Sequence, residues 1–220
     1  MRYKTLYLIL CLLFVSISAS TARADTYTIT DPYTGSPSFN GGPFLINGSM
    51  LTFCLEITEY FNPGGTYYGT INPYADAGGI TPTPGHDDLN PSTAWLYNEF
   101  LNNPNAYGVN ERIALQLAIW RLEDEFGINS MNYGTYESSL GSSAPAIISL
   151  ADSYYTQSSG HSDQSILNVV QVLNLYGNPN LTDKKQSQLI RVPEPNTLLL
   201  LGAGLLGVGL LGRKKFRRKD

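Results

Sequence analysis

The chain has 220 residues with 14 Lys or Arg and 18 Asp or Glu, so its formal net charge is −4. Nine of the basic residues lie near the two ends, three before position 25 and six after position 212. The segment 25–192 therefore holds five basic against sixteen acidic residues, a balance of −11, which excludes nucleic acid and anionic lipid as partners.

The N-terminal segment has the layout of a secretory signal. Arg2 and Lys4 precede an apolar run at 6–17, and the small-residue triplet Ala-Arg-Ala follows at 22–24. This order predicts a signal peptide over residues 1–24 that is removed after export. The apolar run is shorter than the roughly 20 residues that cross a bilayer, which argues against an N-terminal anchor.

Three strands are predicted early in the segment 25–191, which has the length of one domain. They cover 26–30, 43–47 and 50–58. In the third, apolar residues alternate with Thr52, Cys54 and Glu56, which predicts one apolar and one polar face. The following stretch, 62–90, is dense in Gly and Pro and is expected to be a loop.

Helices are predicted in the middle of the domain and strands near its end. The helices cover 91–101, 110–126 and 144–156, the first opening on Pro91 and the second stopping before Gly127. The stretch 166–176 suits a strand or a helix, with a strand favoured, and 188–192 is expected to be the last strand. The order predicts an α+β domain.

The C-terminal segment combines three features in sequence. The tetrapeptide Val192-Pro193-Glu194-Pro195 comes first, an uncharged Leu- and Gly-rich stretch follows at 197–212, and six basic residues lie at 213–219. As a helix, 197–212 would span about 24 Å, slightly less than a hydrocarbon core. The positive charge predicts that the tail stays cytoplasmic while the residues before Pro193 face outward.

This segment resembles the PEP-CTERM sorting signal of exported Gram-negative proteins. The resemblance implies that the segment 192–220 is recognised by an exosortase and removed. The membrane contact would then be temporary, and the domain would reach the cell surface or its polysaccharide matrix. An ordinary single-pass anchor is the alternative.

Two residues in the domain lack an evident partner. Cys11 leaves with the signal peptide, so Cys54 is alone and an internal disulfide is excluded. Gln116 is the one polar residue in the otherwise apolar helical stretch from Ile113 to Trp120. Burying its carboxamide without partners would cost about 1–3 kcal/mol. Attack of the thiolate on the carboxamide would expel ammonia and leave an internal thioester, whereas an inert thiol and a Gln hydrogen-bonded to backbone or water are the alternatives.

The sequences around these two residues resemble bacterial thioester domains of surface adhesins. The similarity lies in Phe53-Cys54-Leu55, in Gln116-Leu-Ala-Ile-Trp120 and in the helical stretch 94–100, within 44–125. It implies a β-sandwich or barrel subdomain with an inserted helical subdomain, and a Cys54–Gln116 thioester. That thioester would be attacked by a lysine amine, or by an amine or hydroxyl of a polysaccharide. Such a protein reacts once, so it is not an enzyme, and it needs no metal or cofactor.

Other functions are open. The Tyr-, Asn- and Gly-rich loops also fit a non-covalent structural or carbohydrate-binding protein of the matrix. A cysteine hydrolase with His86 or His161 lacks a local signature. A calcium loop at Asp87-Asp88 lacks the spaced acidic ladder of such sites. The run Glu123-Asp124-Glu125 is expected to be a solvated cluster.

Overall fold

The computed structural model describes residues 25–32, 42–76, 86–125 and 140–192. The predicted signal peptide, the 197–212 helix and most of the sorting motif (Pro193, Glu194 and Pro195) lie outside these residues. Among the helices that are described, none is long and apolar enough to cross a membrane.

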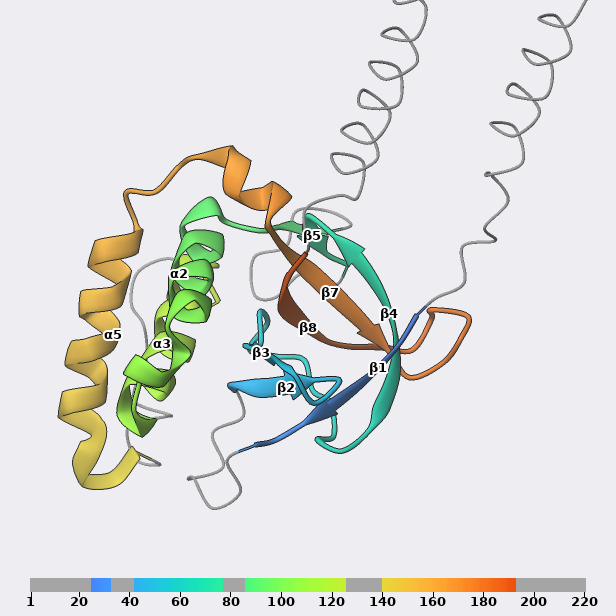
Figure 1. Ribbon diagram of the computed structural model, residues 1–220, viewed down its shortest axis with the longest axis horizontal. Coiled ribbons are helices and arrows are strands. Elements are labelled where there is room, and N and C mark those ends of the chain that lie inside the picture. Colours follow the sequence, from blue (N-terminus) through green and yellow to red (C-terminus); the bar gives the residue numbers. More distant parts are fainter. Residues whose placement is uncertain (1–24, 33–41, 77–85, 126–139, 193–220) are drawn as a thin grey trace, which may run out of the picture.

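The main element is a six-stranded antiparallel sheet in the order β3-β2-β1-β4-β7-β8. It bends strongly around its own axis (Figure 1). The strands in sequence order are β1 (Asp25–Thr30), β2 (Phe44–Ile46), β3 (Met50–Thr52), β4 (Thr66–Asn72), β7 (Val170–Tyr176) and β8 (Lys184–Arg191). Two short strands, β5 (Tyr74–Ala75) and β6 (Asp87–Asp88), pair separately.

The two edges of this sheet come together just after β3. The Leu189 amide donates to the Phe53 carbonyl at 3.0 Å, and the Leu55 amide donates to the Ser187 carbonyl at 2.9 Å. Cys54 lies between these two hydrogen bonds and forms an isolated antiparallel bridge with Gln188. The sheet is therefore a nearly closed barrel, and Cys54 lies on the seam that closes it.

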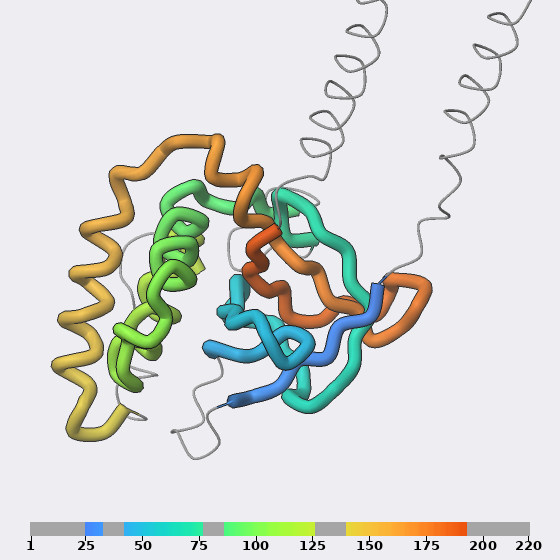
Figure 2. The backbone as a smooth tube through the Cα atoms, viewed as in Figure 1, coloured from blue at the N-terminus to red at the C-terminus, as the bar shows by residue number. Residues whose placement is uncertain are grey.

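Among the described residues between β6 and β7, three helices cover one side of the barrel (Figures 1 and 2). They are α2 (Pro91–Asn102), α3 (Val109–Leu122) and α5 (Ala144–Ser158). Single 3₁₀ turns lie at Pro104–Ala106, Gly141–Ser143 and Gln164–Asn168. The α+β prediction with a helical insertion in a barrel is thus correct at the level of architecture.

Local signals explain where α2 begins and where α3 ends. Asn90 caps α2, since its Oδ1 accepts a hydrogen bond from the Ser92 amide at 2.9 Å, and a proline occupies the first turn. After α3 the chain reverses at Asp124, whose φ is 57°. The Glu125 amide then donates to the Trp120 carbonyl at 2.9 Å, a Schellman ending.

Helix α3 is the centre of the core, because it is buried on nearly every face between Ile113 and Leu122. Ile113, Leu117 and Trp120 join an apolar cluster with strand residues of β1, β2 and β7. Leu115, Ala118, Ile119 and Leu122 join a second cluster that includes α2. A helix packed on both sides has no polar face, so Gln116 had to find its partners inside the protein.

Three predictions about the segments are wrong. The strand predicted over 50–58 is regular only to Thr52, and its expected polar face is buried from Thr52 to Glu56 because the barrel and the helices cover both sides. The loop predicted at 62–90 contains β4, β5 and β6. In the run 123–125, Glu123 and Glu125 are buried, and Asp124 alone is exposed.

The remaining segment predictions need smaller corrections. The helix predicted over 110–126 ends at Leu122, since the Schellman turn stops it. The strand predicted over 166–176 begins at Val170, after a 3₁₀ turn. The last strand begins at Lys184, four residues earlier than predicted, because Gln186, Ser187 and Gln188 are buried polar residues that conceal its pattern.

Candidate functional site

Cys54 and Gln116 are 62 positions apart in the sequence and meet in the fold. The Cys54 amide donates to Gln116 Oε1 at 3.0 Å. Gln116 Nε2 donates in return to the Cys54 carbonyl at 2.8 Å. The side chain of α3 thus binds the backbone of the barrel seam as a neighbouring strand would, and both polar ends of the carboxamide are satisfied.

A second amide lies on the sulfur side of Cys54. Gln188 of β8 donates from Nε2 to Cys54 Sγ at 3.4 Å. On its other side, Gln188 Oε1 lies 3.4 Å from the hydroxyl of Thr52, which also donates to the Leu189 carbonyl at 2.6 Å. Gln188 had no signal in the sequence, since it was predicted only as the first residue of a strand.

The site is enclosed. Cys54 and Gln116 are each 1 % exposed. Burial raises the pKa of the Cys54 thiol to about 12, and the hydrogen bond from Gln188 lowers it in part. At neutral pH the thiol therefore keeps its proton, and forming a thiolate requires a group that takes this proton as the sulfur reacts.

Gly42 forms part of the wall beside Gln116. Its φ is +112°, and a Cβ placed on it would lie 3.4 Å from Gln116 Oε1 and 3.1 Å from the Thr52 carbonyl oxygen. A side chain at this position would press on the carboxamide and on β3. The glycine therefore permits the close approach of backbone to Gln116 that the site requires.

The arrangement can polarise the Gln116 carboxamide. A backbone amide that points at a carbonyl oxygen stabilises negative charge developing there, an effect worth roughly a factor of 10²–10³ per donor in acyl-transfer enzymes. Here the donor is the amide of Cys54 itself, on the residue that also carries the sulfur. The same hydrogen bonds also account for the burial of Gln116 without any crosslink.

The other residues considered from the sequence are placed elsewhere. His86 pairs with Asp88 at 3.3 Å. His161 stacks on Trp95 with ring centroids 3.7 Å apart. The described contacts of Cys54 include no histidine, so the structure offers no support for a cysteine hydrolase.

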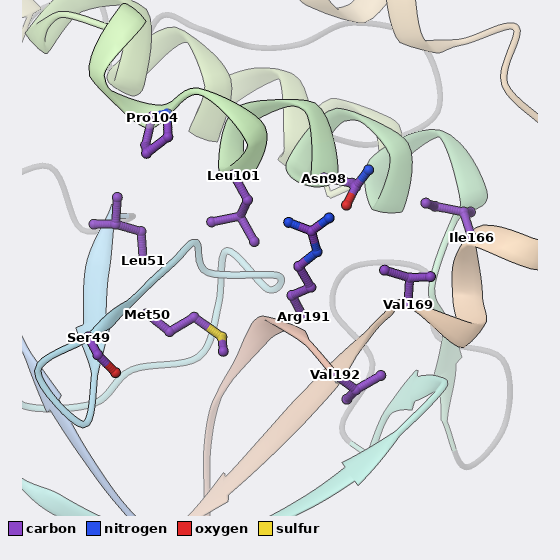
Figure 3. Close-up of a pocket in the computed structure, with 10 residues that line it drawn as sticks. All are labelled: Ser49, Met50, Leu51, Asn98, Leu101, Pro104, Ile166, Val169, Arg191 and Val192. Atoms are coloured by element: carbon purple, nitrogen blue, oxygen red, sulfur yellow. The ribbon is translucent and has the colours of Figure 1, made fainter. Parts of the chain in front are cut away.

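A separate groove of about 710 Å³ lies between the tip of the β2–β3 hairpin, α2 and the end of β8. Figure 3 shows Arg191 reaching from β8 towards α2 inside this groove. The lining residues are mostly aliphatic: Ser49, Met50, Leu51, Asn98, Leu101, Pro104, Ile166, Val169, Arg191 and Val192. This lining has no aromatic ring on which a sugar could stack.

Comparison with known families finds one match, the PEP-CTERM protein-sorting motif at residues 191–219. The chain is therefore an exported protein with a C-terminal sorting signal, and its processing partner is an exosortase. No curated protein and no solved structure matches the chain. The resemblance to thioester domains thus has no support from the comparisons.

Proposed function

We propose that this exported protein forms an internal thioester between Cys54 and Gln116 and uses it to attach covalently to a nucleophile outside the cell. The observation that carries the proposal is the pair of reciprocal hydrogen bonds between the Cys54 backbone and the Gln116 carboxamide. They hold the carboxamide beside the residue that bears the sulfur. They also direct its oxygen at an N–H donor, as acyl transfer requires.

The crosslink forms by exchange of one acyl bond. Cys54 Sγ attacks Cδ of Gln116 to form the S–C bond, the Cδ–Nε2 bond breaks, and the thiol proton leaves with the nitrogen as ammonia. Gln188 Nε2, which donates to Sγ, stabilises the sulfur while it carries negative charge. The Cys54 amide stabilises the developing charge on Oε1.

Capture breaks the S–C bond that the crosslink formed, with the sulfur now the leaving group. An amine or hydroxyl attacks Cδ, the S–C bond breaks, and the proton of the nucleophile passes to the sulfur, which returns to a thiol. The product is an amide or ester between Gln116 and the target. Each molecule reacts once, so the protein is not an enzyme in the sense of turnover, and the step requires no metal or cofactor.

The target belongs to the surface or extracellular polymer that the exported protein meets. The −11 balance of the segment 25–192 favours partners with positive groups, such as lysine-rich proteins or polysaccharides with free amines. The location that we propose is the cell surface or matrix of a Gram-negative bacterium, after cleavage within the segment 192–220.

The experiment that tests the proposal is the intact mass of the exported protein before and after methylamine. A mass short by one ammonia, which rises by one methylamine on treatment, is expected for the native chain. Cys54→Ala and Gln116→Ala, each measured in parallel, should have the full mass and should not react. A native chain with the full mass that methylamine leaves unchanged would reject the thioester.

The non-covalent alternative has less support in the structure. The groove beside Arg191 is a hollow that could take a ligand, and its aliphatic lining suits apolar groups rather than sugars. A carbohydrate-binding role would gain support if the Cys54→Ala variant retained all binding to extracellular polysaccharide.

A further inference from the structure

Three carboxylates from separate elements converge beyond the barrel seam. Glu56 follows the bridge at Cys54, Glu125 ends the turn after α3, and Asp87 lies on β6. One carboxylate oxygen from each lies within 4.8 Å of the other two. Segments far apart in the sequence thus bring three negative groups to one point.

The most unusual member of this cluster is Glu56. It is 1 % exposed, and no described N–H or O–H group donates to either of its carboxylate oxygens. Its polar neighbour is the carboxyl of Glu125, which would bond with it only if one of the two carried a proton. A buried carboxylate without a donor is costly, so a positively charged or protonated group belongs beside it.

The described side chains do not supply that positive charge. The charged groups that face Glu56 are Glu125, Glu59 and Asp87, all of them acidic. The basic side chains nearby bind other groups: His86 pairs with Asp88 at 3.3 Å, and Lys184 donates to the Asp76 carbonyl at 2.6 Å. Helix α3 ends three residues before Glu125, so the negative end of its dipole also faces this region.

We propose that Glu56, Asp87 and Glu125 bind a divalent cation, and that this cation is Ca²⁺. The donor set consists of carboxylate oxygens, which are the ligands that hard cations prefer. Asp87 is half-buried, so the ion has a path from solvent, and Glu56 and Glu125 form the closed side. Ca²⁺ suits the site better than Mg²⁺ because it tolerates irregular coordination by ligands from separate elements.

Two backbone features fix the ligands in place. The Ile57 amide donates to the second oxygen of Glu125 at 2.9 Å, which ties the turn after α3 to the segment after Cys54. The side chain of Gln186 donates to the Glu56 carbonyl. The cation would therefore join the element that carries Gln116 to the element that carries Cys54, in addition to any crosslink between them.

The test is the thermal unfolding of the full chain after treatment with EDTA and dialysis. Millimolar CaCl₂ should raise the Tm by roughly 2–4 °C, the order expected for a weak extracellular site near saturation. NaCl at the same ionic strength should not reproduce this rise. The Cys54→Ala variant should respond as the native chain does, which separates this proposal from the thioester.

Variants locate the site. Glu56→Gln should lose the response to CaCl₂, because a neutral amide is a poor substitute for a carboxylate ligand, and in EDTA it should unfold at a temperature no lower than that of the native chain. Asp87→Asn, at the half-buried position, should also lose the rise in Tm with CaCl₂. It provides a second test if Glu56→Gln folds poorly. Glu99→Gln, at an exposed carboxyl on α2, is the control and should respond normally.

Two results would overturn the proposal. One is a Tm that CaCl₂ does not change beyond the effect of NaCl, which would indicate that a shared proton neutralises Glu56 and Glu125. The other is a full response in both Glu56→Gln and Asp87→Asn, which would place the ion elsewhere.

Discussion

The carboxamide of Gln116 accepts a hydrogen bond from the Cys54 amide and returns one to the Cys54 carbonyl. A side chain from the central helix thereby completes the backbone pairing of the barrel at its seam. This contact has a structural consequence that is independent of any crosslink, because two buried backbone groups depend on one side chain.

Replacing Gln116 should therefore destabilise the fold even when no thioester can form. In a Cys54→Ala background, Gln116→Leu leaves the amide and the carbonyl of residue 54 without partners, and we expect a loss of about 2–4 kcal/mol. Urea unfolding followed by circular dichroism measures this difference. Gln157→Leu, on the exposed face of α5, should change stability by less than about 0.5 kcal/mol. Equal effects of the two substitutions would show that the contact is unimportant.

Gln188→Leu should slow or prevent the crosslink. The amide of Gln188 is the described donor to Cys54 Sγ, and it lowers the pKa of a thiol that burial raises. Without it, the protein should be recovered with the full mass and a free thiol that reacts after denaturation. Any crosslinking that remains in this variant should require a higher pH than crosslinking in the native chain does. A merely structural role of Gln188 would not produce this shift. Gln171→Leu, on β7, is the control, and no change in Gln188→Leu would contradict the role of this donor.

The helices were predictable from the sequence because their signals are local. Asn90 and Pro91 mark the start of α2, and the apolar residues that follow identify its length. Strand β4 was missed because the Gly- and Pro-rich stretches on either side of it dominate the composition there. Its Gly69 also weakens the strand pattern, although a Cβ at that position would lie 2.7 Å from Tyr27 and Leu173, so close packing requires it.

The site was only half predictable. Cys54 and Gln116 stood out as residues without partners, but no spacing in the sequence indicates that they touch. Gln188 and Glu56 gave no signal, since their significance depends on which strands close the barrel. Glu125 was misread as solvated because a Schellman turn, rather than the helix itself, directs it inward.

Gly42→Ala should destabilise the protein more than Gly48→Ala or Gly160→Ala. Its Cβ would lie within 3.1–3.4 Å of the Thr52 carbonyl and Gln116 Oε1, and its φ of +112° is unfavourable for alanine. We expect a loss of about 2–4 kcal/mol, from crowding and backbone strain together. Gly48→Ala, with a φ of +70° and no neighbour within 4 Å, isolates the strain and should cost about 1 kcal/mol. Gly160→Ala, with neither feature, should be nearly neutral, and the order of the three unfolding free energies is the test.

The acidic side chains near the barrel seam should make stability fall as pH rises. Burial, together with the charges of Glu125 and Asp76, raises the pKa of Glu59 to about 7 from its usual 4.5, against the opposing effects of Ser187 and Lys184. Between these two pKa values the folded state keeps the Glu59 proton, whereas the unfolded chain releases it. The contribution of Glu59 to folding stability is therefore fully present below pH 4.5 and is lost as the pH rises through about 7.

In EDTA, the Tm should therefore decrease between about pH 5 and about pH 8. Glu59→Gln should make this decrease smaller, because its neutral amide cannot ionise while its oxygen still accepts from the Ser187 amide, at 3.3 Å in the native chain. Glu99→Gln, on the exposed side of α2, should follow the native profile. Burial also raises the pKa of Glu123 to about 8, so part of the decrease should persist in Glu59→Gln. A Tm that stays constant or rises over this range would show that these carboxyl groups are ionised in the folded protein at neutral pH.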